Sequence, residues 1–218
     1  GTTSFSDTIS ISNPVLWDIH KGNLYVLLTE VYDNDTKLYS KATSYGYRYF
    51  KFDSNTGFWL NGNNVKFKGV CMHHDLGCLG AAVNESAIKR QIQILKKMGV
   101  NAIRLTHNPS SPQFMDVCAE EGLMMIEETF DVWKVKKVNY DFARYFNDNY
   151  AQVLRSAVKA ARNNPGVIMY SLGNEIYDCK RSIEEFGAPK TVQVLKSIVK
   201  ELDSTRPITM GEDAISSY

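Results

Sequence analysis

The arrangement of hydrophobic and polar residues changes near residue 62. Before this point, strand-forming residues dominate 24–32 and 45–52, and the segment Asp33-Asn34-Asp35 between them is typical of a turn. This part of the chain shows strands without helices. The pattern therefore predicts a few antiparallel strands that form part of a β-sandwich.

After residue 62, stretches with helical spacing alternate with short apolar runs. A tight turn at Asn61-Gly62 first joins short strands at 58–60 and 65–67. The first of the strands that alternate with helices is predicted to end before His73. The other four are predicted at 102–106, 123–126, 167–170 and 207–210. Helices are predicted at 84–98, 111–122, 148–162 and 188–202, with 134–147 as an irregular connection. Alternation of this kind, with short connections, predicts a parallel sheet.

The number of strands leaves two architectures open. Five strands occupy roughly 155 residues after residue 62, whereas a complete (β/α)₈ barrel takes about 250 residues. The strand count therefore predicts either an open five-stranded α/β domain or a barrel that stops after its fifth strand.

Polar residues gather at the carboxyl ends of all five strands. In a parallel barrel these ends meet at one face, which is where active sites lie. Successive strands are followed by His73, His74 and Asp75; by Arg104 (on its strand), His107 and Asn108; by Glu128, Asp131 and Trp133; by Asn174 and Glu175; and by Glu212 and Asp213. The fourth group follows the apolar run 167–170, so Glu175 is predicted to be either a catalytic carboxylate or a cap of the next element.

Five motifs in register resemble glycoside hydrolase family 2, the family of β-galactosidases and β-glucuronidases. They are GFWLNG (57–62), KGVCMHHD (68–75), NAIRLTHNP (101–109), EETFDVW (127–133) and SLGNE (171–175). The segment Asn13-Pro14-Val15-Leu16-Trp17 also resembles the entry to the last strands of the family's immunoglobulin-like domain. The resemblance favours the cut barrel. It predicts that 1–56 are the end of an immunoglobulin-like β-sandwich and that 57–218 are the N-terminal part of a TIM barrel.

The resemblance also implies a function, namely a fragment of a retaining exo-β-glycosidase. Glu175 matches the family's acid/base, and Asn174 matches the asparagine that bonds the sugar 2-hydroxyl. Arg104 matches an arginine beneath the catalytic carboxylates, while His73 and His107 resemble histidines of the sugar pocket. The plainer alternatives are an interstrand ion pair for Arg104 and core packing for the histidines.

The resemblance assigns weaker roles to three further residues. Asp75 and Asp131 are candidates for binding sugar hydroxyls, and Trp133 is a candidate for the apolar wall of the pocket. The family's nucleophile is a glutamate after strand seven, and Glu212, after strand five, is a poor substitute. The expected substrate is a terminal β-galactoside, with β-glucuronide and β-mannoside as the next choices.

Two rival functions come from other classes. His73, His74, Asp75 and His107 carry ligand types that suit zinc, which would make the protein a metal-dependent hydrolase. The other rival is a carbohydrate-binding fragment without catalysis. The glycosidase interpretation predicts no cofactor and no metal, because EETFDVW does not reproduce the metal ligands of magnesium-dependent members.

The composition and charge of the chain restrict the classes of binding partner that we expect. The chain has 218 residues, is 44% hydrophobic and 22% charged, and carries a net charge of +1. This balance predicts neither nucleic-acid nor membrane partners, and no signal peptide is visible at the start. The four cysteines show no CxxC pattern and leave the compartment open. Unpaired edges of a cut barrel predict association between copies, that is, a homo-oligomer.

Overall fold

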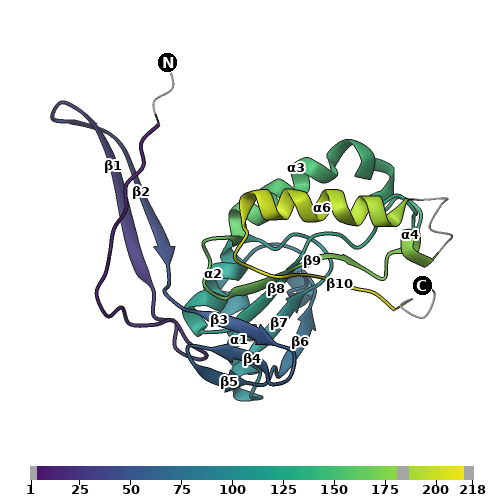
Figure 1. Cartoon of the computed structure of the whole chain (residues 1–218), viewed down its shortest axis with the longest axis horizontal. Coiled ribbons are helices and arrows are strands. Elements are labelled where there is room, and N and C mark those ends of the chain that lie inside the picture. The colour runs from purple at the N-terminus through teal and green to yellow at the C-terminus, as the bar shows by residue number, and fades with distance from the viewer. Residues whose placement is uncertain (1–3, 181–186, 214–218) are drawn as a thin grey trace.

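The structure, a computed structural model, describes residues 4–180 and 187–213 and contains three sheets (Figure 1). β1 (Tyr25–Asp33) and β2 (Thr36–Tyr45) form an antiparallel ribbon that projects away from the other elements. β3 (Phe50–Asp53), β4 (Gly57–Leu60) and β5 (Asn63–Val65) form a small antiparallel sheet. The third sheet is parallel and is the scaffold of the candidate site.

The parallel sheet has five strands in the order β10-β9-β8-β7-β6. Their bounds are Gly69–Met72 (β6), Ala102–Leu105 (β7), Met124–Glu128 (β8), Val167–Asn174 (β9) and Ile208–Gly211 (β10). The long helices between them are α1 (Glu85–Lys97), α2 (Pro112–Glu121), α3 (Ala143–Ala161) and α6 (Ala188–Leu202). Two short helices, η1 (Gly77–Leu79) and α4 (Tyr177–Lys180), follow β6 and β9. This arrangement confirms the predicted partial barrel.

The helix boundaries follow local chemistry. The Asn84 side chain accepts from the Ala87 N–H at 3.0 Å at the start of α1, and Ser111 caps α2 by accepting from Phe114. Gly122 ends α2 with φ of 68°, a left-handed conformation that glycine adopts without strain. These predicted caps are confirmed because each depends only on residues three or four positions away.

Three predicted boundaries were wrong. The run 45–52 is divided, because β2 ends at Tyr45 and β3 begins at Phe50. α3 begins at Ala143, five residues before the prediction, because the Asp141 carboxylate accepts from the Ala143 N–H at 3.0 Å and fixes the first turn. β9 continues past Tyr170 to Asn174, since its last residues pair with β10.

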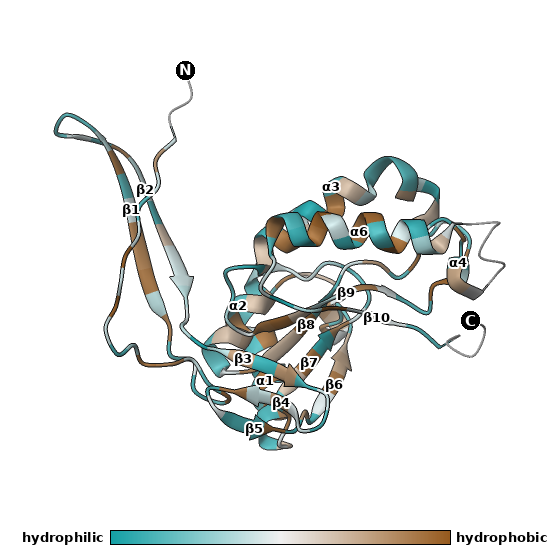
Figure 2. Ribbon diagram, viewed as in Figure 1, coloured by the Kyte–Doolittle hydropathy of each residue, from teal (hydrophilic) through white to brown (hydrophobic). Residues whose placement is uncertain are grey.

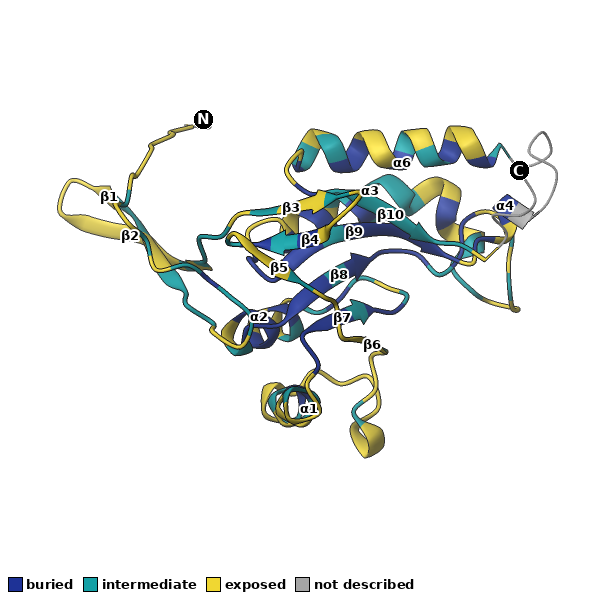
Figure 3. Cartoon of the chain, turned by 60° about the horizontal axis from the view of Figure 1, so that its bottom comes forward, coloured by how far each residue is buried: buried dark blue, intermediate teal, exposed yellow. Residues whose placement is uncertain are grey.

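The core has two parts. The larger lies between the outer face of the parallel sheet and the helices, so α3 and α6 show alternating apolar and polar faces (Figure 2). The smaller lies under the amino ends of the strands, where side chains of the antiparallel sheet meet the start of the barrel. Its buried members are Trp17, Phe58, Leu60, Ala102, Met124 and Ile168. β8 and β9 are almost entirely buried by these two layers (Figure 3).

Three long-range hydrogen bonds from two side chains attach the N-terminal segment to the barrel. The Trp17 indole N–H donates to the Ala119 carbonyl at 2.8 Å. The Arg48 guanidinium donates to the carbonyls of Pro165 and Val167 at 2.9 and 3.0 Å. Burial lowers the pKa of Arg48 to about 9, helped by the nearby charge of Arg206. The N-terminal segment is therefore joined to the barrel by directional bonds as well as by apolar packing.

Candidate active site

Glu128, the last residue of β8, is the centre of a buried polar cluster. Its side chain is fully buried. Oε2 accepts from Arg104 Nε and Nη2 at 3.1 and 2.8 Å and from Ser171 Oγ at 2.6 Å. Oε1 lies 2.5 Å from His107 Nδ1. With both oxygens bonded to groups of β7, β9 and the β7–α2 loop, Glu128 holds these elements together and has no oxygen left to attack a substrate.

Asn174, the last residue of β9, is fixed at both ends of its amide. Its Oδ1 accepts from Arg104 Nη2 at 2.9 Å, and its Nδ2 donates to Asp131 Oδ1 at 3.1 Å. These two contacts determine which way the amide points. They leave the second N–H of Nδ2 as a donor at the carboxyl end of the sheet.

Asp131 links this amide to a cation. The Lys137 ammonium donates to Asp131 Oδ1 at 2.7 Å. Partial burial opposes the charge of Asp131, but hydrogen bonds from Lys137 and Asn174 outweigh it and lower the pKa of the carboxyl. Arg104, Asn174, Asp131 and Lys137 thus form one continuous hydrogen-bonded chain.

Glu175 follows β9 directly and lies on the open face with an exposed side chain. Its φ of 43° is left-handed, a conformation that costs a non-glycine residue about 1 kcal/mol or more. The Glu175 N–H donates to the Gly211 carbonyl at 2.5 Å, which ties this turn to β10. Positive φ outside glycine is uncommon and is enriched at functional positions.

Two of the predicted histidines lie together. The rings of His73 and His107 meet edge to face with centroids 5.2 Å apart. Glu128 accepts from Arg104 and Ser171 through Oε2, and we assign His107 Nδ1 as the donor to Oε1 of the same carboxylate. In the neutral tautomer, His107 Nε2 is then an acceptor, suited to a sugar hydroxyl.

The structure does not bring two other predicted residues into this cluster. Trp133 is fully buried, and its indole N–H donates to the Leu172 carbonyl at 3.0 Å, so it packs beneath β9 instead of forming a pocket wall. The carboxylate of Asp75 accepts from the Gly77 N–H at 2.7 Å and thereby fixes the turn before η1. Trp133 was predicted at the apolar wall of the pocket and Asp75 on a sugar hydroxyl, and in this structure the indole N–H and one Asp75 oxygen have internal partners.

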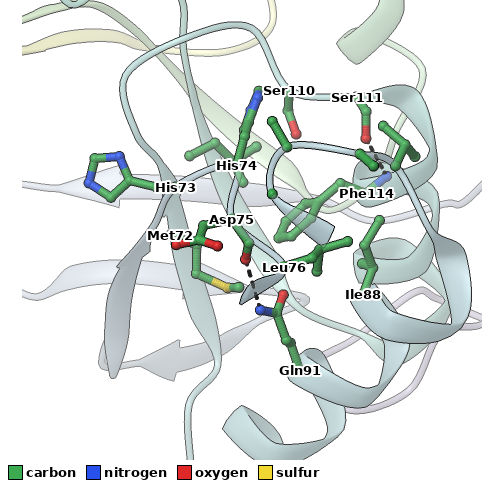
Figure 4. Close-up of a pocket in the computed structure, with 15 residues that line it drawn as sticks. Met72, His73, His74, Asp75, Leu76, Ile88, Gln91, Ser110, Ser111 and Phe114 are labelled. Carbon is green, nitrogen blue, oxygen red and sulfur yellow. Dashed lines mark hydrogen bonds between the residues drawn. The ribbon is translucent and has the colours of Figure 1, made fainter. Parts of the chain in front are cut away.

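His73, His74 and Asp75 line a mostly apolar pocket beside α1 and α2, and His107 is not among its lining residues (Figure 4). His73 points away from His74 in this view, and the Asp75 carbonyl accepts from Gln91. Burial lowers the pKa of His74, with a smaller effect of His73. The Asp75 carboxylate accepts from Gly77 and His107 Nδ1 contacts Glu128, so the four residues of the metal-hydrolase alternative do not form one ligand set. Across residues 4–180 and 187–213, no group of three or more histidine, cysteine or acidic side chains is arranged to hold a metal.

Sequence reasoning missed Ser171, Lys137 and Gly211. Ser171 is paired with Glu128 in the sheet register, and this alignment depends on strand pairing, which no local pattern specifies. Lys137 lies in a connection without periodicity.

Glu127 faces the opposite way from Glu128. Burial raises the pKa of Glu127 to about 8, and its Oε1 accepts from the Ser110 N–H at 3.0 Å.

Comparison with known proteins identifies the scaffold. The model described as "Glycosyl hydrolases family 2, TIM barrel domain" matches residues 53–218, and the model "Glycosyl hydrolases family 2" matches residues 1–48. The chain belongs to glycosyl hydrolase family 2. The family predicted from the motifs is thereby confirmed, whereas the domain boundary between 56 and 57 stays a prediction.

Individual relatives of this family 2 chain carry two activities in their names. The β-galactosidase BoGH2A of Bacteroides ovatus is 42% identical over 95% of this chain and 28% of its own length. A putative β-glucuronidase of Formosa agariphila is 37% identical over 93% of this chain and 19% of its own length. The family 2 chain therefore spans less than a third of these relatives.

Solved structures agree with this family 2 fold. A family 2 member from Bacteroides cellulosilyticus superposes with a TM-score of 0.86 at 39% identity, covering 93% of this chain and 26% of its own. A β-glycosidase from Bacteroides vulgatus gives a TM-score of 0.85 at 35% identity, covering 92% of this chain and 25% of its own.

Of the helices among residues 4–180 and 187–213, none is long and apolar enough to cross a membrane.

Proposed function

We propose that this chain carries the acid/base part of the active site of a retaining exo-β-glycosidase. The observation that carries this proposal is the juxtaposition of Glu175 and Asn174. Glu175 is exposed just past the end of β9, and it follows in the chain Asn174, whose amide Arg104 and Asp131 hold in one orientation.

In the first step, Glu175 gives its proton to the glycosidic oxygen while a second carboxylate forms a bond to the anomeric carbon. The bond from that carbon to the leaving oxygen breaks. In the second step, Glu175 removes a proton from water, and the water oxygen replaces the carboxylate on the sugar. The free N–H of Asn174 Nδ2 donates to the 2-hydroxyl, and His107 Nε2 accepts from another sugar hydroxyl.

The second carboxylate of a retaining enzyme lies about 5–5.5 Å from the first. Glu128 is unsuited to this role because it is fully buried and bonded through both oxygens. Asp131 is paired with Lys137. We therefore assign the nucleophile to a part of the barrel outside this chain, which spans 28% of the length of BoGH2A.

For the substrate we propose a terminal β-galactoside first and a β-glucuronide second. The names of the relatives, β-galactosidase and putative β-glucuronidase, support these two sugars. The third choice, a β-mannoside, rests on the family resemblance alone.

The test uses the gene product that carries this sequence and the variant Glu175→Gln. With a galactoside whose leaving group is a poor one, kcat should fall about 10²- to 10⁴-fold, the usual contribution of a general acid. With a dinitrophenyl galactoside, the glycosylation step should fall much less, because this leaving group needs little protonation. Glu120→Gln is the matched control, since Glu120 is half exposed on α2. Equal rates of Glu175→Gln and parent on both substrates would refute the acid assignment.

A further inference from the structure

The connection between β8 and α3 is held in place by two carboxylates. Asp178, which is fully buried, accepts from the backbone N–H groups of Lys134 and Val135 at 3.3 and 3.0 Å. Asp141 accepts from the backbone N–H of Lys137 at 2.8 Å. These bonds fix the backbone on both sides of Lys137, so the base of its side chain has a defined position although the segment has no regular structure.

The ammonium of Lys137 reaches the end of β9. Nζ donates to Asp131 Oδ1 at 2.7 Å and to the Asn174 carbonyl at 2.8 Å. The Lys137 side chain is 14% exposed and that of Asp131 is 41% exposed, so water reaches the Asp131 carboxylate but only a small part of the lysine. An exposed surface ion pair contributes little, whereas charge-assisted bonds away from water are stronger.

The bond to the Asn174 carbonyl acts on the peptide that joins Asn174 to Glu175. On the other edge of the same peptide, the Glu175 N–H donates to the Gly211 carbonyl at 2.5 Å. A peptide unit is planar, so bonds at its two edges fix its rotation about the chain direction. Lys137 and Gly211 together therefore hold the left-handed turn from which the Glu175 side chain projects.

The bond to Asp131 acts on the neighbouring amide. Asp131 Oδ1 receives both the Lys137 ammonium and Asn174 Nδ2. A charged Asp131 is a stronger acceptor, and the adjacent cation stabilises that charge. Lys137 thus supports the orientation of the Asn174 side chain as well as that of its backbone.

We propose that Lys137 is a positioning residue, which aligns the proton donor Glu175 and the amide of Asn174 through the Asn174 carbonyl and Asp131. This role depends on the proposed glycosidase function, because both aligned groups act on the substrate only in that reaction. Lys137 itself does not touch the reacting atoms.

The test compares Lys137→Met with Lys136→Met in the gene product that carries this sequence. Lys136 is exposed and bonds only Asn139 among the described residues, at 3.1 Å, so it is a matched control with the same chemistry. For Lys137→Met we expect kcat to fall about 10²-fold on glycosides with poor leaving groups, the effect of misplacing a catalytic group by about 1 Å. KM should stay close to that of the parent, and Lys136→Met should match the parent in both constants.

Two further readouts separate positioning from a general structural role. The loss in Lys137→Met should be much smaller on a dinitrophenyl glycoside, which needs little help from the acid. It should also be smaller on a 2-deoxy glycoside, which lacks the hydroxyl that Asn174 binds. If Lys137→Met does not fold, Lys137→Arg keeps the cation and should show the same substrate dependence with a smaller loss, because a planar guanidinium places its donors differently.

The outcomes separate the role of Lys137 from the proposed glycosidase function. If the parent hydrolyses glycosides and Glu175→Gln is impaired, but Lys137→Met matches the parent, only the role of Lys137 is refuted. An equal loss on all three kinds of glycoside also refutes positioning. If the parent cleaves no glycoside of the panel, the proposed function fails and the role of Lys137 fails with it.

Discussion

Replacing Glu128 with glutamine tests the buried centre of the site. The carboxylate accepts four hydrogen bonds, and glutamine has the same shape but only one oxygen. The least costly arrangement turns this oxygen toward Arg104 and Ser171 and the amide nitrogen toward His107. The ring of His107 must then accept at Nδ1, and Arg104 loses its counter-charge.

The magnitude follows from these two losses. Breaking a buried pair by removing one charge costs about 3–5 kcal/mol. The Arg104 side chain is 27% exposed, so solvent screens part of the uncompensated charge and the lower end applies. We expect Glu128→Gln to lower the free energy of unfolding by about 3 kcal/mol. At about 2–4 °C per kcal/mol for a chain of this length, Tm should fall by about 6–12 °C.

Urea unfolding of the 218-residue chain, followed by circular dichroism at pH 7, measures this difference. Glu120→Gln is the control, because Glu120 is half exposed and lies 3.8 Å from Lys89. It should change the free energy of unfolding by less than about 0.5 kcal/mol. A loss below about 1 kcal/mol for Glu128→Gln would show that the four bonds do not act as described.

Three other predictions concern the same chain. Burial raises the pKa of Glu127 to about 8 from 4.5, so the folded state retains a proton and stability falls as the pH rises between these values. Glu127→Gln should make the urea midpoint fall less than that of the parent between about pH 5 and 8, and an equal fall would contradict the assignment. Gly22→Ala should cost about 1–3 kcal/mol in chemical denaturation, because a Cβ there would lie 1.8 Å from the Glu120 carbonyl oxygen; an unchanged midpoint would contradict this contact. The isolated chain should neither turn over aryl β-glycosides nor form an adduct with a fluorosugar, and an adduct on Glu128 or Glu212 in mass spectrometry would locate a nucleophile that we have not recognised.

The parts of the fold that could be predicted depend on neighbours in the sequence. Apolar spacing locates the helices, and Asn84, Ser111 and Gly122 mark helix ends by bonds or conformations within four residues. The strand β2 was missed as a separate element because its residues are mostly polar and exposed. It is a strand through its pairing with β1, which the amino-acid pattern does not specify.

In the candidate site, too, some residues could be predicted from local sequence and others depend on long-range contacts. Arg104, His107 and Asn174 could be named because they end strands and match family motifs. The bond of Lys137 to the carbonyl of Asn174 joins residues 37 positions apart, and that of Ser171 to Glu128 joins residues 43 positions apart. Trp133 and Asp75 were assigned to the pocket from the family resemblance, which does not specify the hydrogen-bond partners of their polar atoms in this chain. Only the packed chain determines that Leu172 and Gly77 use their polar groups.

The bonds of Arg48 to Pro165 and Val167 set an order of events during protein synthesis. Their partners lie 117 and 119 residues downstream. At about 5–20 residues per second, the ribosome needs about 6–23 s to add the intervening segment. Throughout this interval, Arg48 lacks the two carbonyls that it binds in the folded chain. The N-terminal segment therefore cannot complete its attachment to the barrel until the fourth strand of the parallel sheet has been translated.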